Sequence, residues 1–393
     1  MSLHERLNEI PPSGIRRLFD LASRSHNVIS LGIGEPDFDT PEHIKSYARE
    51  ALDRGVTHYT PNSGLKELRE AISRKLKEEN SVQADPEDEI IVTTGGNQAF
   101  LLVWSSFLDH GEEVLIPSPH FVTYSATVRL AGGIPVEIPL SSEGGFRFSG
   151  EDLERYITPR TRAVVINSPN NPTGAVLSDK EIRSIVDVAL SHGLLIISDE
   201  VYESLVYDDT RHVSPASING ASGSVITVNS FSKTYAMTGW RIGYAAGPAP
   251  FISKMVKFQM YLSACPTSFA QYAAALALSD PRSKQSTEAM RCEYRRRRDF
   301  IYGRLKRMPN IQVAKPGGAF YIFPSVGGDD LALSERLLTE AQVAVVPGST
   351  FGSAGRGHLR LAYTLPIEKL EVAMDRLEKF FEDSRKGDFN HKG

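Results

Sequence analysis

The strongest constraint on the fold comes from three short apolar runs, each followed at once by a polar segment. Residues 163–166, 194–197 and 225–228 are rich in valine, isoleucine and leucine, which is typical of buried strands. The polar segments that follow them are 168–174, 198–202 and 229–241. In an open α/β sheet, ligands collect at the carboxyl ends of the strands. We therefore expect the three polar segments to meet in one crevice.

Strand and helix patterns alternate along most of the chain. Further strands are predicted at 90–94, 114–116, 135–138 and 242–246. Ser178 and Glu181 form the pattern of a capping box, which predicts a helix that ends near His192. Past about residue 285 the pattern changes to a long polar helix, short strands and a final helix over 367–381. This order predicts an α/β fold with a differently organised carboxyl-terminal part.

The composition excludes several classes of partner. The chain has 393 residues, of which 41% are hydrophobic and 23% charged, as in ordinary globular proteins. Its formal net charge of −4 offers no general attraction for nucleic acid or anionic lipid, so we expect neither as a partner. The basic run 295–298 is flanked by Glu293 and Asp299, and we expect a solvated helix face there.

The cysteines and the first residues indicate a cytoplasmic protein. Cys265 and Cys292 are too few and too isolated for a disulfide framework or a zinc motif. The first residues lack the apolar core of a signal peptide, and no uninterrupted apolar run could span a bilayer. We therefore expect a cytoplasmic location, no membrane partner and no metal.

The third polar segment gathers hydroxyl groups and cations. Ser230, Ser232 and Lys233 follow the predicted strand, and Arg241 comes eight residues after the lysine. Such a cluster suits a phosphate, and a lysine that emerges from an apolar wall can become the neutral amine that attacks carbonyl groups. Taken alone, Lys233 could equally be a solvated surface residue.

Three other features favour a ligand site, and the first two also have a purely structural alternative. Asp199 ends an apolar strand, where a carboxylate needs a partner, which could be a structural ion pair. Arg360 sits between apolar neighbours in a predicted strand, and its guanidinium either binds a carboxylate or faces solvent. Gly96 and Asn97 begin a helix whose free amides suit a phosphate, without the lysine of a P-loop.

The order of these motifs resembles the aminotransferase class I/II family, the fold-type-I enzymes that use pyridoxal 5′-phosphate. The matching segments are SPNNPTG at 168–174, DEVY at 199–202, Ser232-Lys233, and WRIGY at 240–244. The resemblance implies an α/β fold with a large cofactor-binding domain over 41–285, built on a mixed, mostly parallel seven-stranded sheet flanked by helices. It also implies a smaller α+β domain made of 1–40 and 286–393.

The resemblance assigns a role to each motif residue. Lys233 would hold the cofactor as a Schiff base and then shuttle a proton at the substrate Cα. Asp199 would pair with the ring nitrogen, while Tyr202 and Asn171 would hydrogen-bond the phenolic oxygen. Phe121 would stack on the ring. The implied phosphate cradle consists of Gly96, Asn97, Ser230, Ser232 and Arg241.

Substrate and subunit contacts are implied in the same way. Arg360 would bind the substrate α-carboxylate. The implied substrate contacts together are Gly34, Asn171, Arg360, Ile15 and Leu18. Tyr59 would cross the interface of a homodimer to reach the cofactor phosphate of the partner subunit.

These roles imply a transaminase of amino-acid metabolism that works on amino acids and 2-oxo acids by a ping-pong Schiff-base mechanism. We expect an aromatic donor and 2-oxoglutarate as acceptor, since Asn97 is uncharged where some acid-preferring relatives carry lysine. Residues 30–41 and 255–261 are also similar to archaeal aromatic aminotransferases. An aspartate or broad-specificity (alanine-type) aminotransferase is the alternative, followed by a carbon–sulfur lyase. A nicotinamide oxidoreductase is disfavoured because the glycines of 32–34 lack the dinucleotide pattern.

Overall fold

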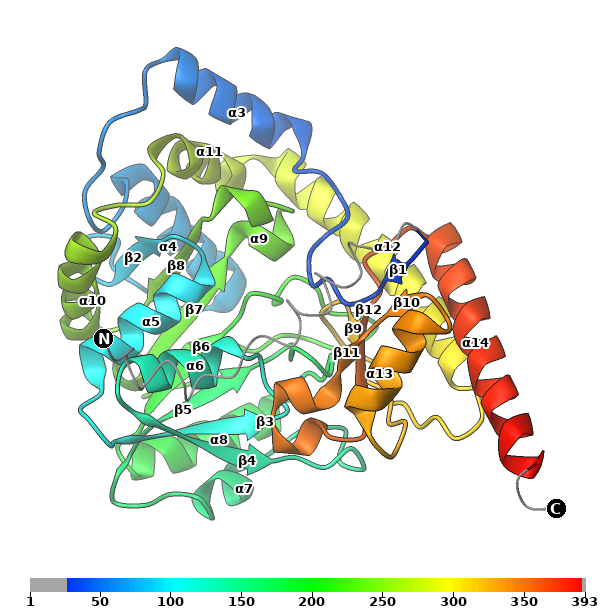
Figure 1. The fold of residues 1–393 in the computed structure, drawn as a ribbon. Coiled ribbons are helices and arrows are strands. Elements are labelled where there is room, and N and C mark those ends of the chain that lie inside the picture. Colours follow the sequence, from blue (N-terminus) through cyan, green and yellow to red (C-terminus); the bar gives the residue numbers. More distant parts are fainter. Residues whose placement is uncertain (1–26, 391–393) are drawn as a thin grey trace, which may run out of the picture.

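The fold is built on a seven-stranded sheet with strand order β2-β8-β7-β6-β5-β3-β4 (Figure 1). The computed structural model describes residues 27–390. The strand bounds are β2 Ile90–Thr93, β3 Glu113–Ser118, β4 Ile134–Pro139, β5 Thr161–Asn167, β6 Leu195–Asp199, β7 Val225–Ser230 and β8 Gly243–Ala246. Strand β8 is antiparallel to both its neighbours, and the other pairs are parallel. The predicted mixed, mostly parallel sheet is confirmed.

Helices cover both faces of this sheet. The helices in this part of the chain are α3 Glu42–Asp53, α4 Lys66–Asn80, α5 Gly96–Phe107, α6 Thr123–Leu130, α7 Gly150–Glu154, α8 Asp179–Ser191, α9 Phe231–Thr234, α10 Ala249–Leu262 and α11 Ser268–Ser279. The long helix α12, Pro281–Leu305, follows them and packs in the carboxyl-terminal core. In β6, Leu195 and Ile197 join a core with α5, α6 and α10, whereas Ile196 joins a core with α8. Burial on both faces explains why the central strands are almost continuously apolar.

The carboxyl-terminal part forms a second core around small sheets. Its elements are β9 Tyr321–Ile322, α13 Asp330–Thr339, β10 Val343–Ala344, β11 Val346–Pro347, β12 Leu359–Ala362 and α14 Ile367–Asn390. Strands β11, β12 and β9 form an antiparallel sheet in that order. Figure 1 shows α12 running from beside α11 to α14, against which it packs.

The segment before α3 contributes to this second part. Strand β1 (Ile29–Ser30) pairs in parallel with β10, which is more than three hundred residues away in the sequence. This pairing supports our proposal that residues 1–40 and 286–393 form one domain and 41–285 the other. Helix α12 passes through the proposed boundary without interruption.

The prediction of a solvated face for the basic run 295–298 is wrong for its second half. Arg297 and Arg298 are buried. Arg297 donates to Asp37 over 2.8 Å, and Arg298 holds both oxygens of Asp208, each at 3.0 Å. These acidic partners lie far away in sequence, so the flanking charges alone could not reveal the burial.

Within residues 27–390, no helix combines the length and the apolar character that crossing a membrane requires.

The capping box that starts α8 is confirmed and provides a test of the fold. The Ser178 hydroxyl accepts from the Glu181 amide over 3.3 Å, and the Glu181 carboxylate accepts from the Ser178 amide over 2.7 Å. We expect Ser178→Ala to lower the free energy of unfolding by about 1 kcal/mol, because the helix loses its cap. Denaturant titration measures the change.

The control is Ser142→Ala, at an exposed position between β4 and α7. Its unfolding free energy should stay within about 0.5 kcal/mol of the parent protein. Equal losses in both variants would contradict the assigned role of the cap.

Candidate active site

A cavity of about 530 Å³ lies at the carboxyl ends of β5, β6 and β7, next to the small antiparallel sheet. It brings together most of the residues singled out in the sequence. Those that line it are Gly34, Gly96, Asn97, Phe121, Asn171, Asp199, Tyr202, Ser230, Ser232, Lys233, Arg241 and Arg360. The expected meeting of the three polar segments is therefore observed.

Lys233 reaches into the cavity from the short helix α9. The Ser230 hydroxyl caps this helix by accepting from the Ser232 amide over 3.2 Å. The Lys233 ammonium donates to the Gly34 carbonyl over 2.6 Å. Burial lowers the pKa of Lys233 to about 8, although nearby Glu35 works in the opposite direction. A neutral amine is therefore accessible close to neutral pH.

Asp199 is a buried carboxylate with polar but no ionic partners. Tyr124 donates its hydroxyl to Asp199 Oδ2, and the Val201 amide donates to Oδ1 over 3.2 Å. No ion pair joins Asp199 to another side chain of the described residues. Burial raises its pKa to about 6, and the bond from Tyr124 limits the rise. A cationic ring nitrogen beside this carboxylate would remove much of the cost of its burial.

Arg360 is a buried guanidinium without a carboxylate. It lies in β12, is 1% exposed, and is sandwiched between the rings of Tyr321 and Phe351 at 4.5 Å and 4.8 Å. It donates to Asn171 Oδ1 over 3.1 Å and to the Gly32 carbonyl over 2.6 Å. Its Nε has no partner among the described residues, and burial lowers its pKa. The solvent-facing alternative is excluded, and the group is suited to bind an anion.

Two tyrosines and a glycine shape the wall between these charges. The hydroxyls of Tyr202 and Tyr321 lie 2.9 Å apart. Burial raises the pKa of Tyr202 well above its usual 10, so it is a neutral hydrogen-bonding group. A side chain at Gly34 would overlap the Tyr321 hydroxyl, so a glycine is needed there.

The amino-terminal end of α5 forms a donor-rich corner of the cavity. Gly95 precedes the helix with φ of 77°, and a Cβ at this position would lie 2.6 Å from a guanidinium nitrogen of Arg241. Arg241 itself has a left-handed φ of 55° and donates to the Thr238 carbonyl over 2.9 Å. The Ser230 and Ser232 hydroxyls lie 2.9 Å apart. Helix amides, hydroxyls and a guanidinium together suit a phosphate group.

One predicted residue, Tyr59, does not line this cavity, and two others lie outside the part of the chain that the structure describes. Tyr59 is 90% exposed, in the loop between α3 and α4. Its expected role concerns a partner subunit and stays a prediction. Ile15 and Leu18 lie outside the described residues, so their expected substrate contacts also stay predictions.

Sequence reasoning missed several residues that line the cavity. They are Ile33, Glu35, Phe100, Tyr124, Val201, Thr238, Gly239 and Tyr321. Tyr124 lies three residues after Phe121 at helical spacing, which is a signal that could have identified it. Tyr321 lies in β9, and its approach to Arg360 depends on the pairing of β9 with β12, which no local pattern reveals.

Comparison with known proteins gives a consistent result. The family model "Aminotransferase class I and II" matches residues 26–377. An aspartate aminotransferase of Pyrococcus abyssi is 55% identical over 388 residues, covering 98% of this chain and 100% of that protein. An aromatic-amino-acid aminotransferase 2 of Thermococcus litoralis is 54% identical with the same coverage. The crystal structure of an aromatic aminotransferase from Pyrococcus horikoshii aligns with a TM-score of 0.90 at 55% identity, covering 94% of this chain and 99% of that one.

Because Tyr124 donates a hydrogen bond to Asp199, we expect that removing the Tyr124 hydroxyl lowers the stability of the fold by an amount that depends on pH. The pKa of Asp199 is raised in the fold, so its ionisation destabilises the protein as pH rises through about 6. In Tyr124→Phe the carboxylate loses a donor, and this pKa rises further. In the cofactor-free protein, we expect Tyr124→Phe to lower the free energy of unfolding by about 1–3 kcal/mol more at pH 8 than at pH 5. Denaturant titrations at both pH values measure the difference.

Tyr207→Phe is the matched control, because the buried Tyr207 hydroxyl donates to the neutral carbonyl of Ala319. Its cost should be the same at both pH values. A pH-independent cost for Tyr124→Phe would show that the hydrogen bond does not stabilise the carboxylate form of Asp199.

Proposed function

The chain belongs to the aminotransferase class I and II family and is a pyridoxal-phosphate-dependent transaminase, and we propose that it transfers the amino group of an aromatic amino acid to 2-oxoglutarate. The donor side of this proposal rests on the charges of the cavity. Among the described residues, the cations that line it are Lys233, Arg241 and Arg360. Each has a proposed task, so none is left for a carboxylate on the substrate side chain.

The proposed cofactor contacts follow from the chemistry of the cavity. The phosphate would be held in the donor-rich corner, by the first amides of α5 together with Ser230, Ser232 and Arg241. Asp199 would pair with the protonated ring nitrogen, because this buried carboxylate has no cation beside it among the described residues. Tyr202 and Asn171 would donate to the phenolic oxygen, and Phe121 would lie against the ring.

The proposed substrate contact is Arg360. Its planar fork can hold both oxygens of an α-carboxylate, and its unpartnered Nε gives it donor capacity to spare. The aromatic rings of Tyr321 and Phe351 keep the guanidinium in one orientation. Both the amino donor and the 2-oxo acid acceptor carry this carboxylate, so one residue would orient both substrates.

Lys233 is proposed to move the proton. When bound, pyridoxal 5′-phosphate supplies an electron-accepting ring that stabilises negative charge formed at the substrate Cα. Lys233 would take the proton from the substrate Cα and return it to C4′ of the cofactor, and the first of these transfers requires a neutral amine. The pKa of about 8 makes that form available. Glu35 lines the cavity beside this amine and raises its pKa.

The proposed preference for aromatic side chains is supported by apolar lining residues. Ile33, Phe121 and Val201 border the cavity, and Asn97 adds no charge at the start of α5. The alternative, an aspartate aminotransferase, is favoured by the name of the Pyrococcus abyssi relative. The acceptor 2-oxoglutarate is carried over from the family resemblance.

We propose a homodimer in which Tyr59 reaches the cofactor phosphate of the partner subunit. The 90% exposure of this ring on a surface loop is compatible with such a contact.

Steady-state kinetics test the proposed donor. We expect kcat/KM for tyrosine and phenylalanine to exceed that for aspartate by at least about tenfold, because a distal carboxylate would be desolvated without a cation. Alanine distinguishes a broad-specificity enzyme, since it lacks both the ring and the charge. Aspartate as the best donor would overturn the aromatic proposal in favour of the alternative.

Lys233→Ala tests the proposed proton transfer. We expect kcat to fall by about 10³-fold or more, because no other described amine lines the cavity. Borohydride treatment of the parent holoprotein followed by peptide mapping should place the cofactor on Lys233. The control Lys254→Ala, on the exposed face of α10, should keep full activity. Labelling of a different lysine would refute the assignment.

A further inference from the structure

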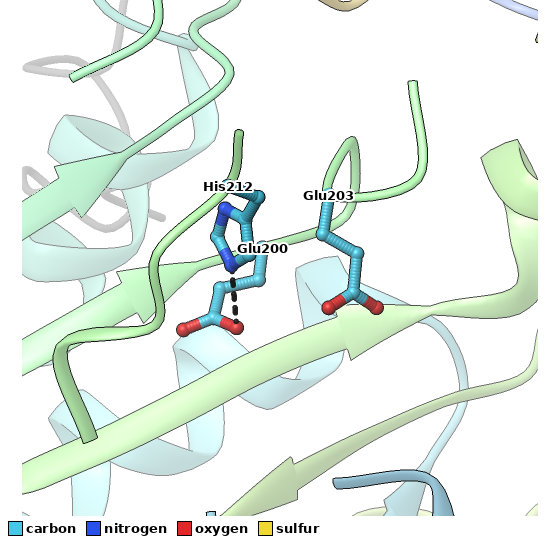
Figure 2. A group of neighbouring side chains, drawn as sticks. All are labelled: Glu200, Glu203 and His212. Carbon is cyan, nitrogen blue, oxygen red and sulfur yellow. Dashed lines mark hydrogen bonds and ion pairs between the residues drawn. The ribbon is translucent and has the colours of Figure 1, made fainter. Parts of the chain in front are cut away.

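A second cluster of ionisable side chains lies outside the set of residues that line the cavity (Figure 2). Glu200, Glu203 and His212 place their polar atoms within 4.8 Å of one another. Glu200 directly follows Asp199, and Glu203 lies in the turn after it. Figure 2 shows the His212 ring facing Glu200, with Nε2 3.1 Å from the carboxylate. The proposed mechanism uses none of these three side chains.

Both oxygens of Glu200 already accept hydrogen bonds. Oε1 accepts from the hydroxyls of Ser198 and Ser214, over 2.9 Å and 2.7 Å. Oε2 accepts from the Asn80 amide over 3.2 Å and faces His212. Glu200 is fully buried, so these contacts replace its hydration.

Glu203 is equally well satisfied. Its Oε1 accepts from the Lys75 ammonium and from the Asn229 amide, the latter over 2.5 Å. Its Oε2 accepts from Asn80 over 2.6 Å. Each oxygen has a protein donor, and Lys75 supplies a cation at the cluster. These contacts favour an internal ionic network over a metal site.

The charges of the network balance only when His212 carries a proton. Glu200 and Glu203 contribute two negative charges and Lys75 one positive charge, and the side chains of all these residues are at most 10% exposed. An unbalanced buried charge is costly. Burial and the positive charge of Lys75 lower the pKa of His212, whereas the carboxylates of Glu200 and Glu203 raise it. The carboxylates have the larger effect, so the pKa lies above its ordinary 6.5. The buried hydroxyl of Tyr244 stays neutral, because burial and the same carboxylates raise its pKa.

The network is joined to two proposed cofactor contacts through the backbone. The Glu200 amide donates to the Val228 carbonyl over 2.9 Å, which ties the end of β6, and therefore Asp199, to β7. Asn229 donates to Glu203 and accepts from the Ser230 amide over 2.7 Å. The Asn229 side chain therefore links the Glu203 carboxylate to Ser230, and the main chain of Glu200 links the end of β6 to β7.

We propose that His212, as an imidazolium, completes a charge-balanced network with Lys75, Glu200 and Glu203, and that this network positions Asp199 and Ser230 for the cofactor. The inference rests on the cofactor contacts proposed above for Asp199 and Ser230. His212 is a positioning residue, because it acts through Glu200 and the strand ends.

The decisive test compares a single with a double variant. In His212→Gln the network keeps an extra negative charge, and the dissociation constant of pyridoxal 5′-phosphate from the protein at pH 6, below the ordinary pKa of histidine, should rise about tenfold. In Glu200→Gln/His212→Gln the charges balance again, and the new amide can donate to the hydroxyls of Ser198 and Ser214. The dissociation constant should return to within about threefold of the parent value. A double variant that binds as weakly as the single variant, or more weakly, would overturn the proposal.

The protonation of His212 can be followed directly by NMR of the holoprotein. The imidazole signal that disappears in His212→Gln identifies the residue, and we expect it to titrate above 6.5, its ordinary value. Titration at or below that value would refute the imidazolium. His192→Gln is the control, because His192 lies 3.6 Å from Glu154 in a solvent-exposed pair and its loss should leave cofactor binding unchanged.

A separate variant distinguishes failure of the network from failure of the proposed contacts. Ser230→Ala should weaken cofactor binding if Ser230 contacts the phosphate. Unchanged cofactor binding in Ser230→Ala would refute the proposed contact between Ser230 and the phosphate. If the double variant does not restore binding, the proposed role of the network is refuted, whereas the proposed contact of Ser230 with the phosphate still stands.

Discussion

The chemistry of the cavity depends on burying charged groups without opposite charges beside them. Asp199 and Arg360 are nearly inaccessible to water, and both are held by neutral hydrogen-bond donors, acceptors or aromatic rings. Desolvation makes each of them a strong partner for a ligand of the opposite charge. Elsewhere in the chain, the buried Arg297 and Arg298 have acidic partners and are structural. The absence or presence of an acidic partner thus distinguishes Arg360, for which a binding role is proposed, from the structural arginines Arg297 and Arg298.

The cavity is assembled from two parts of the protein. The seven-stranded sheet supplies Asp199, Ser230 and, through α9, Lys233. The small antiparallel sheet supplies Tyr321 and Arg360. A substrate that places its carboxylate on Arg360 and its amino group near Lys233 must touch both parts. The parallel strands explain one half of the site, since their carboxyl ends meet at one edge.

Much of this site could be predicted because its residues directly follow apolar runs. Asp199 and Ser230 are the last residues of their strands, so their positions follow from the strand pattern alone. The burial of Arg298 depends on Asp208, and the shape of the wall at Gly34 depends on Tyr321; each pair is distant in sequence. Local patterns carry no information on such pairs. The network of Lys75, Glu203 and His212 was missed for the same reason, since it joins a helix to two loop segments.

Helix α12 connects the two parts as a single rod of 25 residues. At about 1.5 Å per residue it is roughly 37 Å long, and it has no proline after its first turn. A tilt of only about 5° at one end would therefore displace the other end by about 3 Å. Small changes of packing beside α11 would therefore become larger movements of the sheet that carries Arg360.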